Sequence, residues 1–503
     1  MPNTMPKQSS KISQHFWGRK RELSLLNDEY NRPNAHLIAI YGRRRVGKSA
    51  LIEQFVSDKP HLSFEGIEGE HTPSQILHFQ NQLREQTGDK LLSDMSFRTW
   101  ESILSYLTAY LTERALSSKR LVLVLDELQW LAAGRTKLIS LLKYYWDNKW
   151  KPQGVTLVLC GSIASFMIKK VLNSKALYGR INLELHLTAL KPSECVHFLP
   201  NRNPEEILNY LLIFGGIPKY FEEIDIRQSF DKNVARLCFS PQGALFAEFE
   251  RIFYGQFSEA RSYLAIVKAL AGGPRTLTEI SLATKIHSGG GLKGLISNLE
   301  QADFIRLLRK FGSKESTKER KYIISDEYIA FYLKYIKPNI YAIKEQDSYG
   351  LFKKLVKPRW RPWLGIAFER FCLKHSYYLA ELFGFADEVE DSGPLLERDS
   401  PGFQIDLLYK RSDKVIVVCE VKSQLEAVDT EIIPELSKKL ARYKPPRGYS
   451  VEKALISLYG PSASLQKSGF FQHDLRLAQI IAQDSLSQDS GLSRTTKNTR
   501  RRG

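Results

Sequence analysis

The chain has 503 residues, 43% of them hydrophobic and 25% charged, with a formal net charge of +18 and a pI of about 9.4. This length exceeds what one hydrophobic core serves, so two or three globular domains are expected. The composition is that of an ordinary globular protein, and the lack of an apolar run of 18 residues excludes a membrane-spanning helix.

The excess of positive charge is large enough to attract polyanions, of which nucleic acid is the commonest in a cytosol. Part of it lies in the C-terminal sequence SRTTKNTRRRG, so charge alone leaves nucleic-acid binding and a solvated basic tail as equal alternatives. The five cysteines are scattered and form no CxxC pair, which favours buried reduced thiols over a metal site. The first residues lack the apolar core of a secretory signal, and we expect a cytoplasmic protein.

Polar sequence without periodicity at 1–14 and 483–503 predicts disordered tails. From 15 to 190, apolar strand-like runs alternate with amphipathic helical stretches. This alternation is typical of a parallel sheet covered by helices on both faces. The strands expected in this region are 36–42, 61–67, 120–126, 155–161 and 181–187.

The first of these strands runs into GRRRVGKS at 42–49 and then into a helix-like segment. The motif fits G-x-x-x-x-G-K-[ST] between a strand and a helix, the context that identifies a P-loop. Its glycines let main-chain N–H groups turn toward phosphate oxygens at a helix N-terminus. Lys48 is expected to reach the β and γ phosphates of ATP, and Ser49 to ligate Mg²⁺. The ATP-binding residues predicted here are Gly42, Arg43, Arg44, Arg45, Val46, Gly47, Lys48 and Ser49.

Two carboxylates, Asp126 and Glu127, end the apolar strand LVLVLDE, where they are costly unless they hold a cation or its water. Asp126 is the predicted Mg²⁺ ligand, and Glu127 the predicted catalytic residue that polarises the attacking water. The alternative for Glu127 is an acid favoured by the dipole at a helix N-terminus. Ser162 ends the next strand, where it is a candidate sensor of the γ-phosphate of ATP or, equally, a helix N-cap.

Further segments resemble the archaeal-type ATPases of the STAND branch of AAA+ proteins. FWGRKREL resembles the opening box of that family, which cups the nucleotide base, DELQW matches around the two acids, and GGIP resembles its G-x-P element. The resemblance extends from about 15 to 340. It implies that Gly18, Arg19 and Pro218 bind ATP, and that Arg180 senses or stabilises phosphate charge in catalysis. For Arg180, a surface salt bridge is an equal alternative.

The mostly helical pattern at 191–255 predicts a helical lid. From 256 to 340, three helices and a hairpin predict a winged helix. The expected recognition helix carries Lys293 as its one cation, so the richer wing suits phosphate contact better than base reading. A module that only packs on the ATPase is the alternative. The expected wing cations are Arg306, Arg309, Lys310, Lys314, Lys318, Arg320 and Lys321.

The pattern returns to α/β at 345–482. Asp406 lies in QIDLLYK, and after 13 residues IVVCEVK provides Glu420 and Lys422. Two carboxylates and a lysine suit the binding of Mg²⁺, by Asp406 and Glu420, and the activation of water against a phosphodiester. The alternative is an exposed ion pair of little energetic value.

This D-x13-E-x-K pattern resembles the PD-(D/E)xK nuclease fold, a domain that the ATPase family above often carries at its C-terminus. The resemblance implies that Glu369 is the upstream acid and that Glu369, Asp406, Glu420 and Lys422 are catalytic. Domains of this fold can keep their acids and lose cleavage, so activity stays open.

The sequence therefore predicts an α/β protein: a P-loop NTPase with an AAA+-like parallel sheet, a helical lid, a winged helix and a restriction-endonuclease-like C-terminal domain. The favoured function is an ATP-binding and ATP-hydrolysing protein that uses Mg²⁺ and switches a nuclease-like domain on nucleic acid, DNA above all. Self-association is left open and no membrane partner is expected. The rival is a nucleotide-dependent regulator or scaffold whose last domain binds nucleic acid without cleaving it.

Overall fold

The computed structural model describes residues 16–115, 120–134, 137–257, 259–312, 320–397 and 402–482. The tails expected at 1–14 and 483–503, and the wing residues Lys314 and Lys318, lie outside this part of the chain. None of the helices that the structure describes has both the length and the apolar character needed to cross a bilayer.

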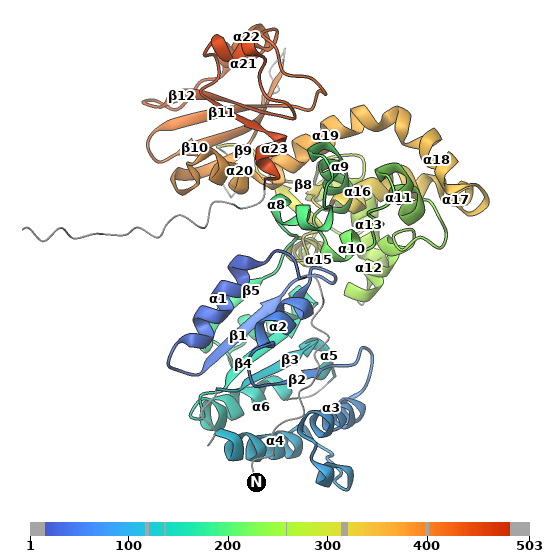
Figure 1. Cartoon of the computed structure of the whole chain (residues 1–503), viewed down its shortest axis with the longest axis vertical. Helices are drawn as coiled ribbons and strands as arrows, with labels where there is room; N and C mark the ends of the chain where they lie inside the picture. The colour runs from blue at the N-terminus through green and yellow to red at the C-terminus, as the bar shows by residue number, and fades with distance from the viewer. Residues whose placement is uncertain are drawn as a thin grey trace, which may run out of the picture.

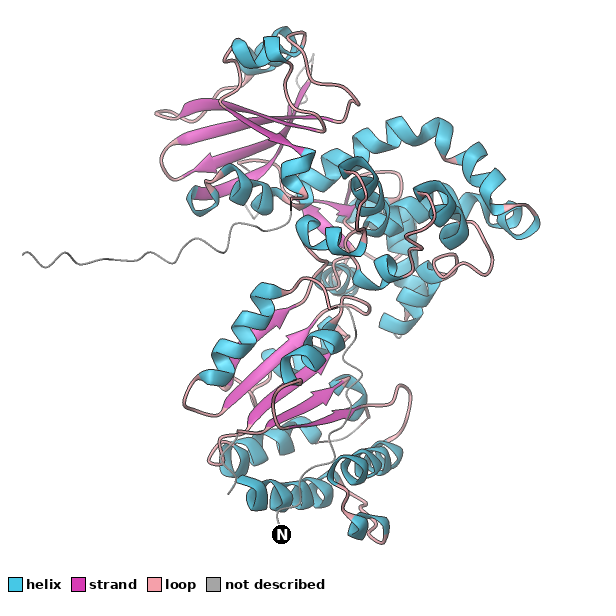
Figure 2. Cartoon of the chain, in the orientation of Figure 1, coloured by secondary structure: helices cyan, strands magenta, loops and turns pink. Residues whose placement is uncertain are grey.

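The N-terminal region is built on a five-stranded parallel sheet, in the order β2-β3-β4-β1-β5. Every residue of β1 and β4 is buried because helices cover both faces of the sheet (Figure 2). The predicted class, α/β with a parallel sheet, is thereby confirmed. The strands are β1 (His36–Tyr41), β2 (His61–Glu65), β3 (Val122–Asp126), β4 (Thr156–Gly161) and β5 (Ile181–His186).

Alternate residues of the central strand β1 enter different hydrophobic clusters. Ile38 and Ile40 pack in one cluster with Leu51 of the following helix, while Leu37 packs in the other. Such two-sided burial explains why the strands read as continuous apolar runs in the sequence. The covering helices are α1 (Lys20–Asn31), α2 (Lys48–Val56), α3 (Thr72–Thr87), α4 (Trp100–Ala115) and α6 (Leu138–Tyr145).

A helical region follows the sheet and leads into three helices and a small three-stranded sheet, in the order β6-β8-β7. The predicted order of three helices and a hairpin is therefore present. The helices of the first region are α8 (Pro192–Cys195), α9 (Pro204–Phe214), α10 (Pro218–Glu222), α11 (Phe230–Cys238) and α12 (Glu248–Gln256). The next are α13 (Ala260–Leu270), α14 (Leu277–Thr284) and α15 (Gly290–Gln301), with β6 (Arg275–Thr276), β7 (Ile305–Leu308) and β8 (Lys321–Ile324).

The C-terminal region holds a second five-stranded sheet, which Figure 1 shows at the opposite end of the molecule from the first. Its order is β13-β12-β11-β10-β9, antiparallel from β9 to β11 and parallel from β11 to β13. The strands are β9 (Val389–Glu397), β10 (Phe403–Arg411), β11 (Val415–Lys422), β12 (Ser450–Ser457) and β13 (His473–Arg476). The helices from 327 onward include α16 (Glu327–Phe331), α17 (Ile340–Glu345), α18 (Ser348–Leu355), α19 (Trp360–Lys374), α20 (Ser376–Phe383), α21 (Ile432–Arg442), α22 (Ala463–Lys467) and α23 (Leu477–Ile480).

Candidate functional site

The glycine-rich turn between β1 and α2 has a shape that requires its glycines. A Cβ atom on Gly42 would lie 2.2 Å from the carbonyl oxygen of Leu187, and Gly47 has a φ of 89° at the N-cap of α2. Left-handed backbone of this kind is adopted readily by glycine alone. The turn therefore leads into α2 at the carboxyl edge of the sheet, where the N–H groups that begin the helix can face an anion.

Lys48 is buried, and its ammonium donates a hydrogen bond to the carbonyl oxygen of Arg43 over 3.1 Å. The cation is thus held inside the turn, within reach of whatever the turn encloses. This position fits the predicted role of Lys48 toward the phosphates of ATP.

Ser49 and Asp126 come from different elements and meet directly. The Ser49 hydroxyl donates to Oδ2 of Asp126 over 2.9 Å, and the N–H of Glu127 donates to Oδ1 over 2.7 Å. A hydroxyl and a carboxylate in contact are the oxygen ligands that Mg²⁺ takes beside phosphates. The two residues therefore fit the predicted metal position.

Glu127 is fixed by side chains from two elements. Its Oε2 accepts a hydrogen bond from the Ser162 hydroxyl over 2.7 Å and another from the Gln129 amide. Gln129 also donates to the Ser162 hydroxyl over 3.0 Å, which closes a triangle beside Asp126. Ser162 is not a helix N-cap, because Ile163 occupies that position before α7 (Ala164–Phe166). Gln129 was missed by the sequence analysis, although it lies within the DELQW motif.

Arg180 is not brought to this site. It immediately precedes β5, and the parallel register pairs Ile181 with Leu37 at the start of β1, whereas the glycine-rich turn follows the end of β1. Arg180 therefore lies at the opposite edge of the sheet, where its guanidinium donates to both carboxylate oxygens of Asp147 over 2.8 and 2.9 Å. This placement corrects the expectation that Arg180 senses or stabilises phosphate charge, and matches the alternative of a salt bridge.

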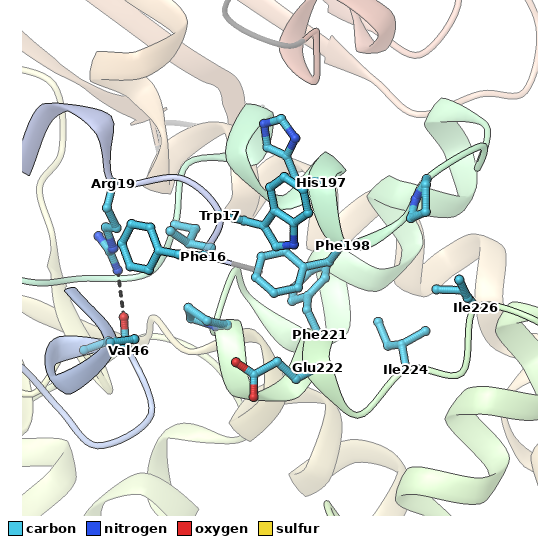
Figure 3. Close-up of a pocket in the computed structure, with 15 residues that line it drawn as sticks. Phe16, Trp17, Arg19, Val46, His197, Phe198, Phe221, Glu222, Ile224 and Ile226 are labelled. Atoms are coloured by element: carbon cyan, nitrogen blue, oxygen red, sulfur yellow. Dashed lines mark hydrogen bonds between the residues drawn. The ribbon is translucent and has the colours of Figure 1, made fainter. Parts of the chain in front are cut away.

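The segment before α1 closes over the glycine-rich turn. Gly18 turns the chain with a φ of 76°, and the Arg19 guanidinium donates to the carbonyl of Val46 over 3.0 Å, the dashed line in Figure 3. Arg19 is thus bound to the main chain of the turn, and its side chain is buried. Its role is to hold the turn against the first segment, which places the neighbouring aromatic residues.

Beside the turn lies a largely apolar cavity of about 650 Å³ (Figure 3). The Trp17 ring stacks on His197 with centroids 5.1 Å apart. Pro218 lies beside Gly47 in the wall, since a Cβ atom on Gly47 would be 3.8 Å from the proline Cγ. A largely apolar cavity with a stacked aromatic pair in its wall, next to the glycine-rich turn, suits a purine base. The wall residues that the sequence analysis missed come from the helical region: His197, Phe198, Pro200, Phe221, Glu222, Ile224 and Ile226.

The three arginines of GRRRVGKS do not point into the turn. The Arg43 guanidinium forms a buried ion pair with Asp326, at the N-cap of α16. Arg45 pairs with Glu248 of α12 over 2.9 Å, and Glu248 is fully buried. These side chains connect the turn to the helical parts of the molecule. Arg44 pairs with the more exposed Glu68 over 2.6 Å.

A second cluster of charged residues lies in the C-terminal sheet. The antiparallel register pairs Leu407 with Cys419, so Asp406 and Glu420 are neighbours across β10 and β11. Asp406 accepts a hydrogen bond from the N–H of Val421 over 3.0 Å, and Lys422 lies 3.1 Å from Glu420. The alternative of an exposed ion pair does not apply, since Glu420 is 1% exposed.

The cluster also includes residues from two helices. Burial, and then the charges of Asp406 and Glu420, raise the pKa of Glu369 on α19 to about 7. Lys439 on α21 donates to both oxygens of Glu420 over 2.8 and 2.9 Å. The structure thus gathers the four predicted residues and adds Lys439, which lies 19 positions beyond Glu420 with no spacing signal.

The raised pKa of Glu369 predicts a pH-dependent stability. A carboxyl with a raised pKa in the folded state stabilises that state fully below its unfolded pKa and loses this contribution as pH rises toward about 7. We expect thermal unfolding of the wild type to shift to lower temperature between pH 5 and pH 8. The difference between wild type and Glu369→Gln isolates this group, and an identical pH profile for the two would contradict the assignment.

Part of the hairpin formed by β7 and β8 is hydrogen-bonded to the C-terminal sheet. The N–H of Phe311 donates to the carbonyl of Pro394 over 3.0 Å, and the N–H of Gly312 donates to Asp391 over 2.9 Å. Both acceptors belong to β9. Arg306, predicted as a wing cation, is partly buried and lines two neighbouring hollows. This part of the expected wing therefore contacts the C-terminal sheet.

Residues 16–224 match a protein family described as an ATPase domain predominantly from Archaea. The chain is 29% identical over 414 residues to the uncharacterized protein MJECL04 of Methanocaldococcus jannaschii. The aligned residues cover 81% of this chain and 87% of that protein. It is also 50% identical over 44 residues, or 9% of its length, to the uncharacterized ATP-binding protein MJ0423 of the same organism, 75% of which is covered.

Two solved structures are similar to this one. The Walker-type ATPase PABY2304 of Pyrococcus abyssi has a TM-score of 0.47 and 20% identity, over 63% of this chain and 96% of that one. The ORC2 protein of Aeropyrum pernix, in ADPNP–ADP complexes, has a TM-score of 0.41 and 15% identity, over 68% of this chain and 98% of that one. The family match ends before the carboxylate cluster of the second sheet.

Proposed function

We propose, because this chain belongs to the archaeal-type AAA+ P-loop ATPase family, that it is an ATPase whose nucleotide state controls a C-terminal half acting on DNA. The observation that carries the second part is the cluster of Glu369, Asp406, Glu420 and Lys422 in the same chain as the ATPase domain. Two sites with separate chemistry would thus be joined in one molecule.

In the ATPase site, the glycine-rich turn would hold the triphosphate with its N–H groups, while Lys48 moves from the Arg43 carbonyl to the β and γ phosphates. Mg²⁺ bound by Ser49 and Asp126 would neutralise charge on the phosphate oxygens. Glu127, oriented by Ser162 and Gln129, would align the attacking water. The neighbouring apolar cavity would take the base.

Two arginines of the glycine-rich turn would couple the bound nucleotide to the helical parts of the molecule. Arg43 holds the N-cap of α16, and Arg45 holds α12. Because both ion pairs begin in the loop that wraps phosphate, a change of loop conformation on binding ATP would change how α12 and α16 are held. A ligand shifts a conformational equilibrium only through such differential contacts.

The C-terminal cluster would bind a divalent cation for phosphodiester cleavage. Burial and the charge of Glu420 raise the pKa of Asp406, so an added cation would relieve the repulsion between the two carboxyls. The ammonium groups of Lys422 and Lys439 now neutralise Glu420. In the described part of the chain, no three acidic, histidine or cysteine side chains are close enough to hold a metal ion. Binding would therefore require Lys439 to withdraw and phosphate oxygens or water to complete the coordination.

The three helices and hairpin at 260–324 would act as a winged helix that binds DNA through phosphates. The exposed cations Lys293, on α15, and Arg309, after β7, would make such contacts. The contacts of Phe311 and Gly312 with β9 would then place DNA close to the C-terminal sheet.

Plasmid nicking in the presence of Mg²⁺ and ATP tests this function. Glu420→Gln is expected to reduce nicking to the level of a chelator control. Glu435→Gln is the matched control, because Glu435 is 53% exposed and lies 3.5 Å from both Lys422 and Lys439. Nicking retained in Glu435→Gln and lost in Glu420→Gln supports a nuclease. Intact plasmid with retained DNA binding would instead favour the regulator or scaffold.

A further inference from the structure

A second cleft, of about 550 Å³, lies where five parts of the chain meet, and it shares Leu190 as a wall residue with the cavity beside the ATP site. Its walls come from the glycine-rich turn, the connection from β5 to α8, the connection from α9 to α10, the segment from α15 to α16, and the junction of α19 and α20. Figure 1 shows α8, β8 and α20 together at this junction. Its volume is typical of a site for a small metabolite.

Most of the charged side chains in the cleft wall have partners. Arg43 is paired with Asp326, Lys374 donates to both oxygens of Glu327 over 2.7 and 2.8 Å, and Lys191 pairs with Glu381 over 3.0 Å. These three ion pairs fix the walls, and the other acidic and basic side chains that line the cleft are Glu300, Asp303 and Arg306.

Arg306 differs from the three paired cations. Its side chain lines this cleft and the adjoining small hollow, and it forms no hydrogen bond or ion pair with any residue that the structure describes. Burial lowers the pKa of Arg306 to about 10, an effect that the charge of Glu327 offsets only in part. Arg306 is partly buried, and a guanidinium partly withdrawn from water without a direct ion-pair partner is costly. An anionic ligand would reduce that cost.

Two further residues that line the cleft with Arg306 determine what else a ligand would contact. Burial first, and then the charges of Lys374 and Arg306, lower the pKa of His375 to about 3, so this ring is neutral. Oδ2 of Asp303 is buried without a hydrogen bond, and Nε2 of His186 lies 3.6 Å from it. Asp303 therefore offers an acceptor for an N–H or O–H group.

We infer that this cleft binds a small organic anion, whose phosphate or carboxylate group pairs with Arg306 and whose donor group bonds to Asp303. Because Arg43 of the glycine-rich turn forms part of the wall, an occupant would also contact the side chain that joins the ATP site to α16. The cleft is thus a candidate effector site, and its existence does not depend on nuclease activity.

Thermal unfolding of the full chain tests the site, with saturating ADP present so that the ATP site cannot take up the probes. Pyrophosphate and citrate are titrated separately at constant ionic strength, which distinguishes a phosphate from a carboxylate ligand. We expect at least one of them to raise the melting temperature of the wild type in a saturable way. Arg306→Met is expected to weaken the apparent affinity at least about tenfold.

The ligand-free Arg306→Met variant gives an independent readout, because loss of a partly buried cation without an ion-pair partner should leave the melting temperature unchanged or raise it. Lys293→Met is the matched control: it removes an exposed cation on α15 outside the cleft. If Arg306→Met folds poorly, Arg306→Gln removes the positive charge at the same position and keeps a polar side chain. Equal shifts in the wild type and both cleft variants, or no shift with either anion, would overturn the inference.

Discussion

ATP hydrolysis by Lys48→Ala is expected to fall by about 10²- to 10³-fold at saturating ATP and Mg²⁺, the loss typical of removing one preorganised donor to a transition-state charge. The other three cations of the turn are not placed to substitute for it, since Arg43, Arg44 and Arg45 are paired with Asp326, Glu68 and Glu248. Lys48 alone among them donates into the turn, to a main-chain carbonyl. Steady-state phosphate release measures the effect.

Arg44→Ala is the matched control for this prediction. It removes a cation from the same turn, but Arg44 is 35% exposed and its partner Glu68 is 52% exposed, so little stability or activity is at stake. Both variants should unfold at the temperature of the wild type. Hydrolysis that survives in Lys48→Ala, or that falls equally in Arg44→Ala, would show that the ammonium does not act on phosphate.

Arg43→Met is expected to lower the free energy of unfolding by about 3–5 kcal/mol, the cost of leaving one partner of a buried ion pair uncompensated. Asp326 would then be a buried, unpaired carboxylate, and it also accepts a hydrogen bond from the N–H of Ile329 over 2.7 Å. The variant also loses the contact between the Arg43 guanidinium and the Phe304 ring, whose centroid lies 5.0 Å from Cζ. Urea unfolding followed by circular dichroism measures the change.

The double variant Arg43→Met with Asp326→Asn should recover much of this loss, because asparagine can still cap α16 and carries no charge. Arg44→Met, whose ion pair is exposed, should stay within about 0.5 kcal/mol of the wild type. Equal stability of the Arg43→Met and Arg44→Met variants would mean that the ion pair of Arg43 with Asp326 does not stabilise the contact between the glycine-rich turn and α16.

The ATP site could be predicted from the sequence because its key residues follow strand ends. GRRRVGKS is contiguous, and Asp126 and Ser162 each follow a strand whose carboxyl end must meet the same edge of a parallel sheet. The same rule places Arg180 at the other edge, since it precedes its strand instead of following it. The order of residues along the chain is therefore enough to separate Arg180 from the glycine-rich turn.

Other features depend on contacts between segments far apart in the chain. The positions of Arg43 and Arg45 were assigned to ATP because they lie in the motif, yet their partners lie 283 and about 200 residues away. Lys439 reaches Glu420 from a helix whose packing no local pattern specifies. The acids Asp406 and Glu420 were predictable, because a hairpin brings residues together at a fixed register.

The contact between the β7–β8 hairpin and β9 has a consequence for dissecting the molecule. β9 is an outermost strand of the second sheet, and the main-chain N–H of Phe311 bonds to its outer side at Pro394. An exposed edge strand offers unpaired N–H and C=O groups to other chains, and proteins prevent such pairing by covering the edge. A fragment that begins after the hairpin would lose that cover, and its tendency to aggregate would say nothing about whether the second sheet can fold.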